Sequence, residues 1–343
     1  MKTDREKHGL RGAVERVLVE TLQFEEQGGQ TTEKPWFSHT MTFNQDGWLI
    51  EQTNRNPDGS EWRAVSEYSD SGKLLAMRSY EPSGALAGEV RYVYDDQQRL
   101  VAEQQITQDG KFTTPITYAY DDSGGKIKTQ ELDLPEDTGV MIGIEGTITS
   151  ITAGEAKRIE TRYNDHGEAV EVKVFNTAGS LASRVEITHD VHGNAIEDTQ
   201  YVGDVDPFGQ CAGSCSTEEM ESLTEEQKAE LAAAVAQMFS PGTPMSKHTH
   251  TYDVEGRLIE SKLTMMGMVA SRQIFSYDQA GNKSEEVSYN EDGTLASKAI
   301  FTRDYDEHGN WTRELVSTVS SWDAEFGLST PAHVTRRTIT YYT

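Results

Sequence analysis

The sequence has 343 residues but only two cysteines, no apolar run of transmembrane length and few basic residues. Cys211 and Cys215 lie in one stretch, GQCAGSCS, and no second cysteine pair exists to complete a four-ligand zinc site. They fit either a local disulfide in an oxidising compartment or two free thiols. The sequence also has no G-x-S-x-G, P-loop, HExxH or dinucleotide-binding pattern, so it gives no support for an enzyme.

The charge balance is strongly acidic. Lys and Arg number 31 against 57 Asp and Glu, which gives a formal net charge of -26. Nucleic acid and anionic membrane surfaces are polyanions, so this balance argues against both as partners. The surplus is typical of a well-solvated surface, and it leaves open a preference for a basic partner or a divalent cation.

The apolar content is low for a chain of this length. Hydrophobic residues make up 35% and the mean hydropathy is -0.64. This composition favours thin cores between neighbouring structural units over one large globule. The first residues, MKTDREKHGL, lack the apolar core of a signal peptide, so the protein is either cytoplasmic or carries its signal outside this sequence.

A short phrase recurs along the chain: an aromatic residue, Asn or Asp, two variable residues and Gly. Its clearest copies begin at Tyr163, Tyr252, Tyr277 and Tyr305. Asn or Asp can bond the backbone two residues on, and Gly supplies a positive φ without steric cost, so each phrase predicts a tight turn. Two classes of turn alternate, as in YDVEGRLIE and YNEDGTLAS, and we expect each class to line its own edge of a sheet.

The segments between these turns alternate with period two. Val170, Val172 and Val174 share one parity, while Glu171 and Lys173 take the other. One apolar face with period two is typical of a half-buried antiparallel strand. The sequence therefore predicts an all-β fold. We expect a coiled antiparallel β-meander, a solenoid-like sheet of hairpin repeats with one small helical insertion.

The phrases YDVEGRLIE, YDQAGNK and YDEHGNW resemble the YD repeats of Rhs-type proteins, which teneurins and the shell subunits of insecticidal toxin complexes also carry. The resemblance covers roughly residues 40–316, with two interruptions. It implies a spiralling β-sheet that encloses a cargo or presents a binding surface. It also implies a place outside the cytoplasm.

The spacing of the phrases divides the chain into four parts. Residues 1–42 are expected to form an N-terminal capping hairpin, and 43–201 a first array of repeats with an enlarged loop near 132–150. Residues 202–247 form an insertion that contains both cysteines. Residues 248–343 complete the repeats and end in a closing strand.

The insertion contains the one convincing helix pattern. Thr224 and Gln227 form a capping box, and Leu231, Val235 and Phe239 then share one face at helical spacing. This helix is expected either to cover the sheet or to project as a recognition element, since long insertions in repeat proteins often lie on the binding face.

Several side chains are candidates for binding. Exposed Trp48 and Trp62 would stack on sugar rings, whereas buried ones would pack between strands. His248 and His250 alternate on a strand and should share a face, but no third metal ligand is evident, so no metal site is predicted.

The turns themselves contribute further polar candidates. One slot of the turn is filled by histidine three times, at His166, His192 and His308. The acidic stretch around Asp304 and Asp306 departs from the D-x-D-x-D-G spacing of a calcium loop, so calcium is only a weak candidate and no other cofactor is expected.

The sequence favours a non-catalytic binding or structural protein. Its sheet surface and the 202–247 insertion would contact a protein or a glycan, without nucleic acid and without a transmembrane segment. We expect an extracytoplasmic location, with cytoplasmic as the alternative. The alternative functions are a shell or chaperone-like partner of a separately encoded toxin or effector and, after that, a carbohydrate-active enzyme.

Overall fold

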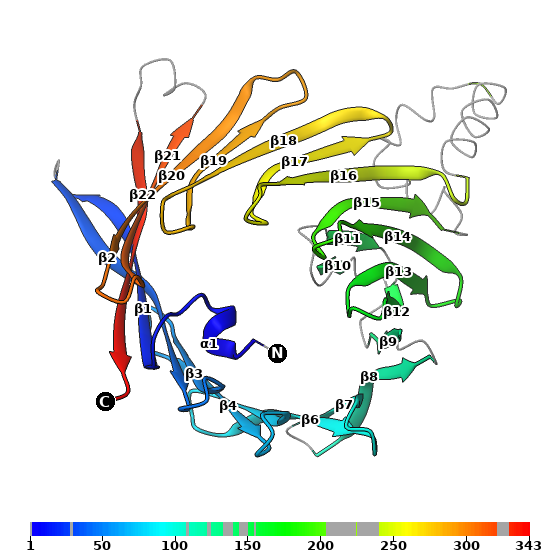
Figure 1. Ribbon diagram of the computed structural model, residues 1–343, viewed down its shortest axis with the longest axis horizontal. Helices are drawn as coiled ribbons and strands as arrows, with labels where there is room; N and C mark the ends of the chain where they lie inside the picture. The colour runs from blue at the N-terminus through cyan, green and yellow to red at the C-terminus, as the bar shows by residue number, and fades with distance from the viewer. Residues whose placement is uncertain are drawn as a thin grey trace. The chain divides into compact units, whose positions relative to one another are not determined.

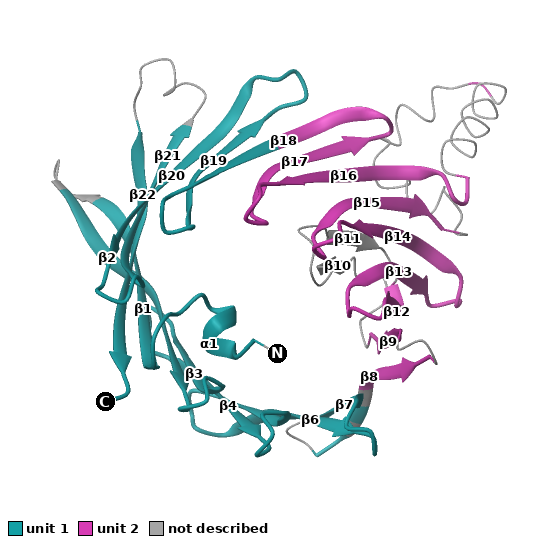
Figure 2. Cartoon of the chain, in the orientation of Figure 1, with its two compact units in different colours: residues 1–114, 273–343 teal, residues 115–272 magenta. Residues whose placement is uncertain are grey.

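A computed structural model describes residues 2–27, 30–107, 110–121, 125–132, 140–143, 150–153, 156–203, 224, 240–320 and 329–343. Strands make up most of this part of the chain. The chain divides into two compact units, unit 1 from residues 1–114 with 273–343 and unit 2 from residues 115–272 (Figure 2). No helix among the described residues has the length and apolarity needed to cross a membrane.

Unit 1 consists of one short helix and long antiparallel strands (Figure 1). Its elements are α1 (Asp4–Lys7), β1 (Val14–Gln27), β2 (Gln30–Phe43), β3 (Leu49–Arg55), β4 (Glu61–Tyr68), β5 (Leu74–Tyr80), β6 (Leu86–Tyr94), β7 (Leu100–Thr107), β19 (Lys283–Tyr289), β20 (Leu295–Tyr305), β21 (Trp311–Ser320) and β22 (Thr330–Tyr341).

Unit 2 is also a series of antiparallel strands, with a separate two-stranded sheet of β10 and β11. Its elements are β9 (Lys126–Glu131), β10 (Val140–Gly143), β11 (Ser150–Ala153), β12 (Ala156–Tyr163), β13 (Ala169–Asn176), β14 (Leu181–His189), β15 (Ala195–Val202), β16 (Pro244–Tyr252) and β17 (Leu258–Met265). Two further strands, β8 (Phe112–Tyr120) and β18 (Met268–Tyr277), run across the boundaries between the units.

The turns follow the chemistry expected from the recurring phrase. In the turn after β20, Asp306 N–H donates to Asn310 O at 2.9 Å and Gly309 N–H donates to Asp306 O at 3.1 Å. The Asp306 carboxylate accepts from His308 N–H at 3.0 Å and from Asn310 N–H at 2.8 Å. Gly309 has φ 80°, which a residue with a Cβ rarely adopts. The side chain after the aromatic residue therefore holds the turn together.

One turn lacks its glycine and keeps the same backbone. Gln98 occupies the glycine position after β6 with φ 64°. Its N–H donates to Asp95 O at 2.8 Å, as the glycine N–H does in the other turns. The turn thus forms at the cost of a left-handed conformation for a residue with a Cβ.

Tyrosines of several phrases tie neighbouring turns together. Tyr68 OH donates to Leu49 O at 3.2 Å, and Tyr94 OH donates to Leu74 O at 2.9 Å. Each tyrosine therefore reaches the strand that begins after the previous turn on the same edge. Each also follows a register shift in its strand pair, so the spacing of the phrase includes a β-bulge.

The prediction of a coiled, solenoid-like meander is wrong, because the first and last strands of the sheet pair with each other. Twenty strands belong to this sheet, and β1 pairs with β2 on one side and with β22 on the other (Figure 1). The two terminal segments expected to cap opposite ends of an array instead lie side by side. The strand order is that of a closed antiparallel sheet, which satisfies backbone groups that free edges would leave unpaired.

The apolar faces form one cluster in each unit. In unit 1, the strands around β1 bury a cluster that consists of Leu10, Val14, Val17, Val19, Met41 and Phe43. In unit 2, strands β12 to β15 bury Ala156, Ile159, Tyr163, Ala169, Val172, Val174, Val185, Ile187 and Ala195. Val172 and Val174 alternate as the period-two pattern predicts, whereas Ala169 and Val14 are out of phase with the strand beyond them because a register shift intervenes.

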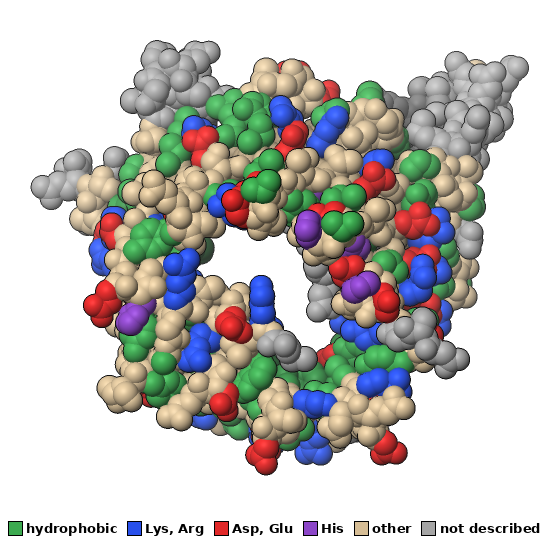
Figure 3. Space-filling view, viewed as in Figure 1, with side chains coloured by type: hydrophobic (Ala, Val, Ile, Leu, Met, Phe, Trp, Pro, Cys, Tyr) green, Lys and Arg blue, Asp and Glu red, His purple; other side chains and the backbone are tan. Residues whose placement is uncertain are grey.

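The polar positions carry charges of both signs. On the face seen in Figure 3, basic side chains lie among acidic ones over both units. Some form ion pairs across neighbouring strands, as Arg63 does with Glu51 at 3.1 Å and Arg272 with Glu260 at 2.7 Å. Each exposed pair contributes about 0–1 kcal/mol, so these pairs fit a solvated surface better than a source of stability.

Candidate functional site

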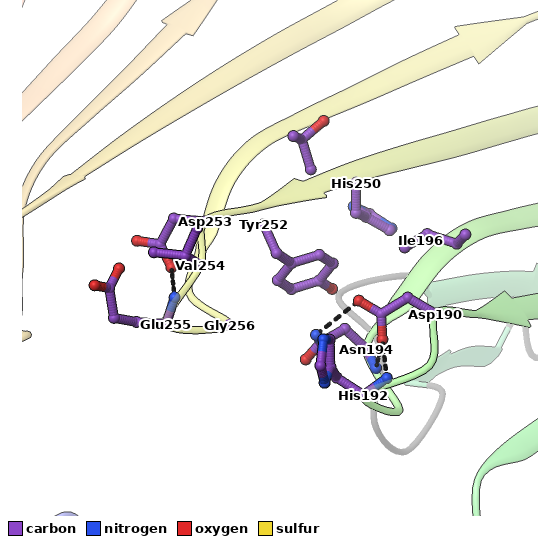
Figure 4. A pocket seen from close by; sticks show the side chains of 11 residues that line it. Asp190, His192, Asn194, Ile196, His250, Tyr252, Asp253, Val254, Glu255 and Gly256 are labelled. Atoms are coloured by element: carbon purple, nitrogen blue, oxygen red, sulfur yellow. Dashed lines mark hydrogen bonds between the residues drawn. The ribbon is translucent and has the colours of Figure 1, made fainter.

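Unit 2 contains a hollow of about 570 Å³ at one edge of its sheet (Figure 4). Two turns form its rim, one between β14 and β15 and the other between β16 and β17. The residues that line it are Asp190, His192, Asn194, Ile196, His250, Thr251, Tyr252, Asp253, Val254, Glu255 and Gly256. Since β15 and β16 pair directly, the two turns lie two strand spacings apart, about 10 Å.

The carboxylates of Asp190 and Asp253 hold the two rims in shape. Asp190 accepts from His192 N–H at 2.8 Å, from Asn194 N–H at 2.9 Å and from the Asn194 amide at 2.9 Å. The hydrogen bonds from Asn194 hold the pKa of Asp190 below its ordinary value. Asp190 is therefore ionised at neutral pH, and both of its oxygens are engaged.

Asp253 plays the same part in the second rim. It accepts from the backbone N–H of Glu255 at 3.0 Å and of Arg257 at 2.9 Å, and its other oxygen accepts from Arg257 Nε at 2.7 Å. Burial alone would raise the pKa of Asp253, but the hydrogen bonds and charge of Arg257 lower it. The guanidinium is thereby drawn onto Asp253 and Glu255, and Arg257 itself does not line the hollow.

Tyr252 connects the two rims. Its hydroxyl donates to Ala195 O at 2.8 Å, at the start of β15. In Figure 4 its ring lies between the two turns, with Ile196 and His250 on the strands beside it. The hollow thus has an aromatic surface fixed by a hydrogen bond, with apolar Ile196 and Val254 and polar turn residues around it.

A buried carboxylate lies behind the hollow, between two histidines. Asp198 on β15 is 1% exposed, and its two oxygens lie 3.0 Å from His248 Nδ1 and 3.1 Å from His250 Nε2. His248 and His250 share one face of β16, as predicted, and their rings stack at 6.1 Å. His250 is 6% exposed, and its Nδ1 is buried without a hydrogen-bond partner among the described residues.

This arrangement is a hydrogen-bonded cluster. Each histidine places one ring nitrogen within hydrogen-bond distance of a different oxygen of the same carboxylate. Across the described ranges, no group of three or more His, Cys, Asp or Glu side chains is placed to hold a metal ion. Sequence reasoning missed Asp198 because it lies 50 positions before His248 and meets it only through strand pairing.

The tryptophans proposed for binding belong to unit 1, whereas the residues of the hollow belong to unit 2. Trp48 stacks on Tyr68 with ring centroids 5.6 Å apart, and a Cβ added to Gly72 would lie 2.5 Å from its ring. Trp48 is therefore packed between neighbouring turns. Trp62 on β4 is 43% exposed and opposite Asn54 on β3, so it remains the more accessible of the two.

The predicted helix and cysteines lie outside the described residues, except for Thr224. This applies to Cys211, Cys215, Leu231, Val235 and Phe239, so the disulfide and the recognition helix stay predictions.

The turn histidines lie where the recurring phrase places them. His166, His192 and His308 each donate a backbone N–H to the Asn or Asp two positions before, at 2.8–3.0 Å. His192 alone among them lines the hollow. In the suggested calcium stretch, the second oxygen of Asp306 accepts from Tyr341 OH at 2.5 Å, while Asp304 is exposed near Arg313. The Asp306 carboxylate thus serves the fold.

Comparison with known proteins gives low similarity. A porin-like protein from Bacteroides uniformis has a TM-score of 0.33 and 11% identity, covering 95% of this chain and 96% of that one. TcdB2-TccC3 has a TM-score of 0.23 and 12% identity, covering 88% of this chain and 19% of that one. A porin-like protein from Bacteroides vulgatus has a TM-score of 0.29 and 8% identity, covering 81% and 97%. These scores are all below 0.5 and do not establish a common fold.

The predicted membership of the Rhs and YD-repeat family is wrong. The sequence matches no protein-family model and no curated protein. The structure has a closed strand order in place of the spiralling sheet that the resemblance implied. The phrase is a local turn code: an Asx side chain, a positive-φ position and a tyrosine that reaches the previous turn can serve any long antiparallel sheet.

Proposed function

We propose that the protein is a non-catalytic binding protein that acts outside the cytoplasm and binds a sugar unit of a glycan in the hollow of unit 2. The observation that carries this proposal is the lining of the hollow. It combines the ring of Tyr252 with apolar Ile196 and Val254 and with polar side chains from two turns, and no Lys or Arg belongs to the described part of the lining.

This lining fits a neutral, hydroxyl-rich ligand. The apolar face of a sugar ring packs against an aromatic ring, while its hydroxyls need donors and acceptors around the edge. Glu255 is 59% exposed and His192 is exposed at the opposite rim, so both can bond a hydroxyl. A phosphate or carboxylate ligand would meet three acidic side chains and, among the lining residues that the structure describes, no Lys or Arg, which disfavours it.

The state of the two aspartates favours binding over hydrolysis. A glycosidase requires two carboxyl groups that face the substrate, one of them with a raised pKa. Asp190 and Asp253 instead have lowered pKa values and oxygens committed to their own turns. The support for a location outside the cytoplasm is weaker and comes from the sequence, since an oxidising compartment would join Cys211 and Cys215.

A protein partner is the second candidate, and a specific observation favours it. The tips of the two rim turns carry Val191, which is 95% exposed, and Val254, which is 98% exposed. Neighbouring apolar tips of this kind gain from burial against another protein surface. A protein that covers both would also close the hollow.

The test is a binding titration of the full chain with neutral monosaccharides and their short oligomers. Calorimetry and the NMR signals of unit 2 monitor the binding. We expect saturable binding that His192→Ala and Glu255→Gln each weaken about tenfold, which corresponds to one hydrogen bond of about 1.4 kcal/mol. His166→Ala is the matched control, because His166 fills the same slot of a neighbouring turn but does not line the hollow.

The outcomes separate the two candidates. Sugar binding that all three variants leave unchanged would place the sugar elsewhere and reject the hollow. If no sugar binds, and Val191→Ser with Val254→Ser abolishes capture of a protein from the native source, the protein-partner candidate replaces the glycan. Fractionation of native cells tests the location separately, and recovery in the cytoplasm would reject that part of the proposal.

A further inference from the structure

Unit 1 contains an arginine whose charge is poorly matched by its surroundings. The guanidinium carbon of Arg337 on β22 lies 3.4 Å from the ring centroid of Trp311 on β21, so the two groups stack. The side chain is half-buried, and its Nε is buried without a hydrogen-bond partner among the described residues. The stacked ring supports one face of the guanidinium but accepts none of its in-plane hydrogens.

The carboxylates near Arg337 are used by another residue. Among the described residues, none forms an ion pair with Arg337 within 4.0 Å. Glu314 is the acidic group that acts on it electrostatically, but its carboxylate binds Arg303 at 2.5 Å. Burial is the largest effect and lowers the pKa of Arg337 to about 10; Glu314 acts against this and Arg303 adds to it.

The neighbouring arginine shows the ordinary arrangement. Arg336 is exposed and pairs with Glu33 at 2.5 Å. A half-buried cation without a paired carboxylate carries a desolvation cost that no ion pair offsets. A cost of this kind at one position is typical of a functional site.

Two histidines extend the positive region around Arg337. Val19 on β1 pairs with His39 on β2 and with Arg337 on β22, so His39 and Arg337 share one face, two strand spacings or about 10 Å apart. Burial lowers the pKa of His39, and the charge of Arg337 and then His8 lowers it further. Burial also lowers the pKa of His8, which Asp4 raises and Arg337 lowers again.

We propose that Arg337, held on Trp311 and flanked by His39, is a binding site for the anionic group of a small ligand, a carboxylate or a phosphate. The guanidinium fork donates in-plane hydrogen bonds that match both groups, and Arg is better suited to this than Lys because its donors are planar and paired. His39 adds a donor on the same face. This site is independent of the hollow, which lies in unit 2 and disfavours anions.

The test uses the full chain labelled with ¹⁵N in its arginines and titrates it with inorganic phosphate and, separately, with acetate at constant ionic strength. We expect a saturable shift of the Arg337 Nε–H signal and a rise in the pKa of His39, because a bound anion favours the charged imidazole. In Arg337→Lys, the anion-induced rise in the pKa of His39 should be at least fivefold smaller than in wild type. Arg336→Gln is the matched control, and it should leave that rise unchanged.

The response of the wild-type arginine signals to each of the two anions decides whether the site exists and which ligand it binds. Saturation by phosphate alone assigns a phosphorylated ligand, saturation by acetate alone a carboxylate ligand, and saturation by both the shared chemistry. If neither anion gives a saturable shift at Arg337, or if Arg336 shifts equally, the site is rejected. The wild-type titration stands even if Arg337→Lys fails to fold.

Discussion

The hydroxyl of Tyr252 donates a hydrogen bond to the carbonyl oxygen of Ala195, 57 positions earlier in the chain, at 2.8 Å. The corresponding bond from Tyr68 to Leu49 spans 19 positions. The same contact is thus made across very different chain lengths. It fixes the aromatic surface of the hollow and couples its two rims.

Tyr252→Phe removes this hydrogen bond and keeps the ring. We expect a loss of about 1 kcal/mol in the free energy of unfolding, because the Ala195 carbonyl loses its side-chain donor. Urea unfolding measures it. Tyr80→Phe is the control, since the Tyr80 ring lies against Arg63 and its hydroxyl forms no such bond to any residue that the structure describes. Equal losses in both variants would contradict a specific role for the bond.

Gln98→Gly should stabilise the protein. Gln98 has φ 64°, a conformation that costs a residue with a Cβ about 1 kcal/mol and costs Gly nothing. The side-chain contact of Gln98 with Lys73 at 3.2 Å is exposed and offsets little of this gain. We expect a thermal midpoint raised by a few degrees. Gln97→Gly, one position earlier, relieves no positive-φ strain and should lower the thermal midpoint or leave it unchanged.

Gly72→Ala should destabilise the protein more than Gly84→Ala. Both glycines have positive φ, 77° and 82°, so both substitutions incur a backbone penalty of about 1 kcal/mol. A Cβ at Gly72 would also lie 2.5 Å from Trp48, whereas nothing lies within 4 Å at Gly84. We expect an additional loss of about 1–3 kcal/mol at Gly72. Chemical unfolding gives the difference, and an equal loss would show that Trp48 moves freely.

Asp306 should make stability depend on pH in the acidic range. Burial tends to raise its pKa, but hydrogen bonds from Tyr341, Asn310 and His308 outweigh this and lower the pKa from 3.8. The folded protein therefore binds this proton less readily than the unfolded chain. The stabilisation that ionised Asp306 gives the folded protein is fully present above the pKa of an unfolded Asp. It is lost as pH falls through the lowered pKa of the folded state.

The comparison is between wild type and Asp306→Asn, because Asn fills this turn position elsewhere, as at Asn164. Urea midpoints from pH 7 to pH 2 should fall less steeply in the variant than in wild type. Asp304→Asn, at an exposed position, should follow wild type. If the urea midpoint of Asp306→Asn falls with pH as steeply as that of wild type, the Asp306 carboxylate does not contribute to the pH dependence of stability.

The local structure was predictable because each turn is specified within five residues. Asp253 with Gly256 shows the code: an Asx side chain that caps the backbone and a residue that adopts positive φ. Closure was not predictable from the same pattern. Alternation in β1 reveals which face is buried but not which strand lies at each edge, so its pairing with β22 is absent from the sequence signal.

The candidate sites were predictable only in part, for a related reason. The His248 and His250 pair is visible as alternation within one strand, and its common face is confirmed. Asp198 joins it only through the pairing of β15 with β16. The stacking of Arg337 on Trp311 likewise depends on which strands are neighbours. Local patterns specify local geometry, and sites assembled across strands require the topology.

The reach of Tyr252 to Ala195 has a consequence for how such a chain can change. β15 ends at Val202 and β16 begins at Pro244, at the edge opposite the tyrosine contacts, and the two strands pair although 41 residues separate them in the sequence. The turns at that edge of unit 2, such as 176–180, are therefore expected to tolerate inserted segments while the tyrosine edge holds the register. A foreign peptide inserted for display, or a domain inserted during evolution, is expected to preserve the fold when it enters at that edge and to disrupt it at the tyrosine edge.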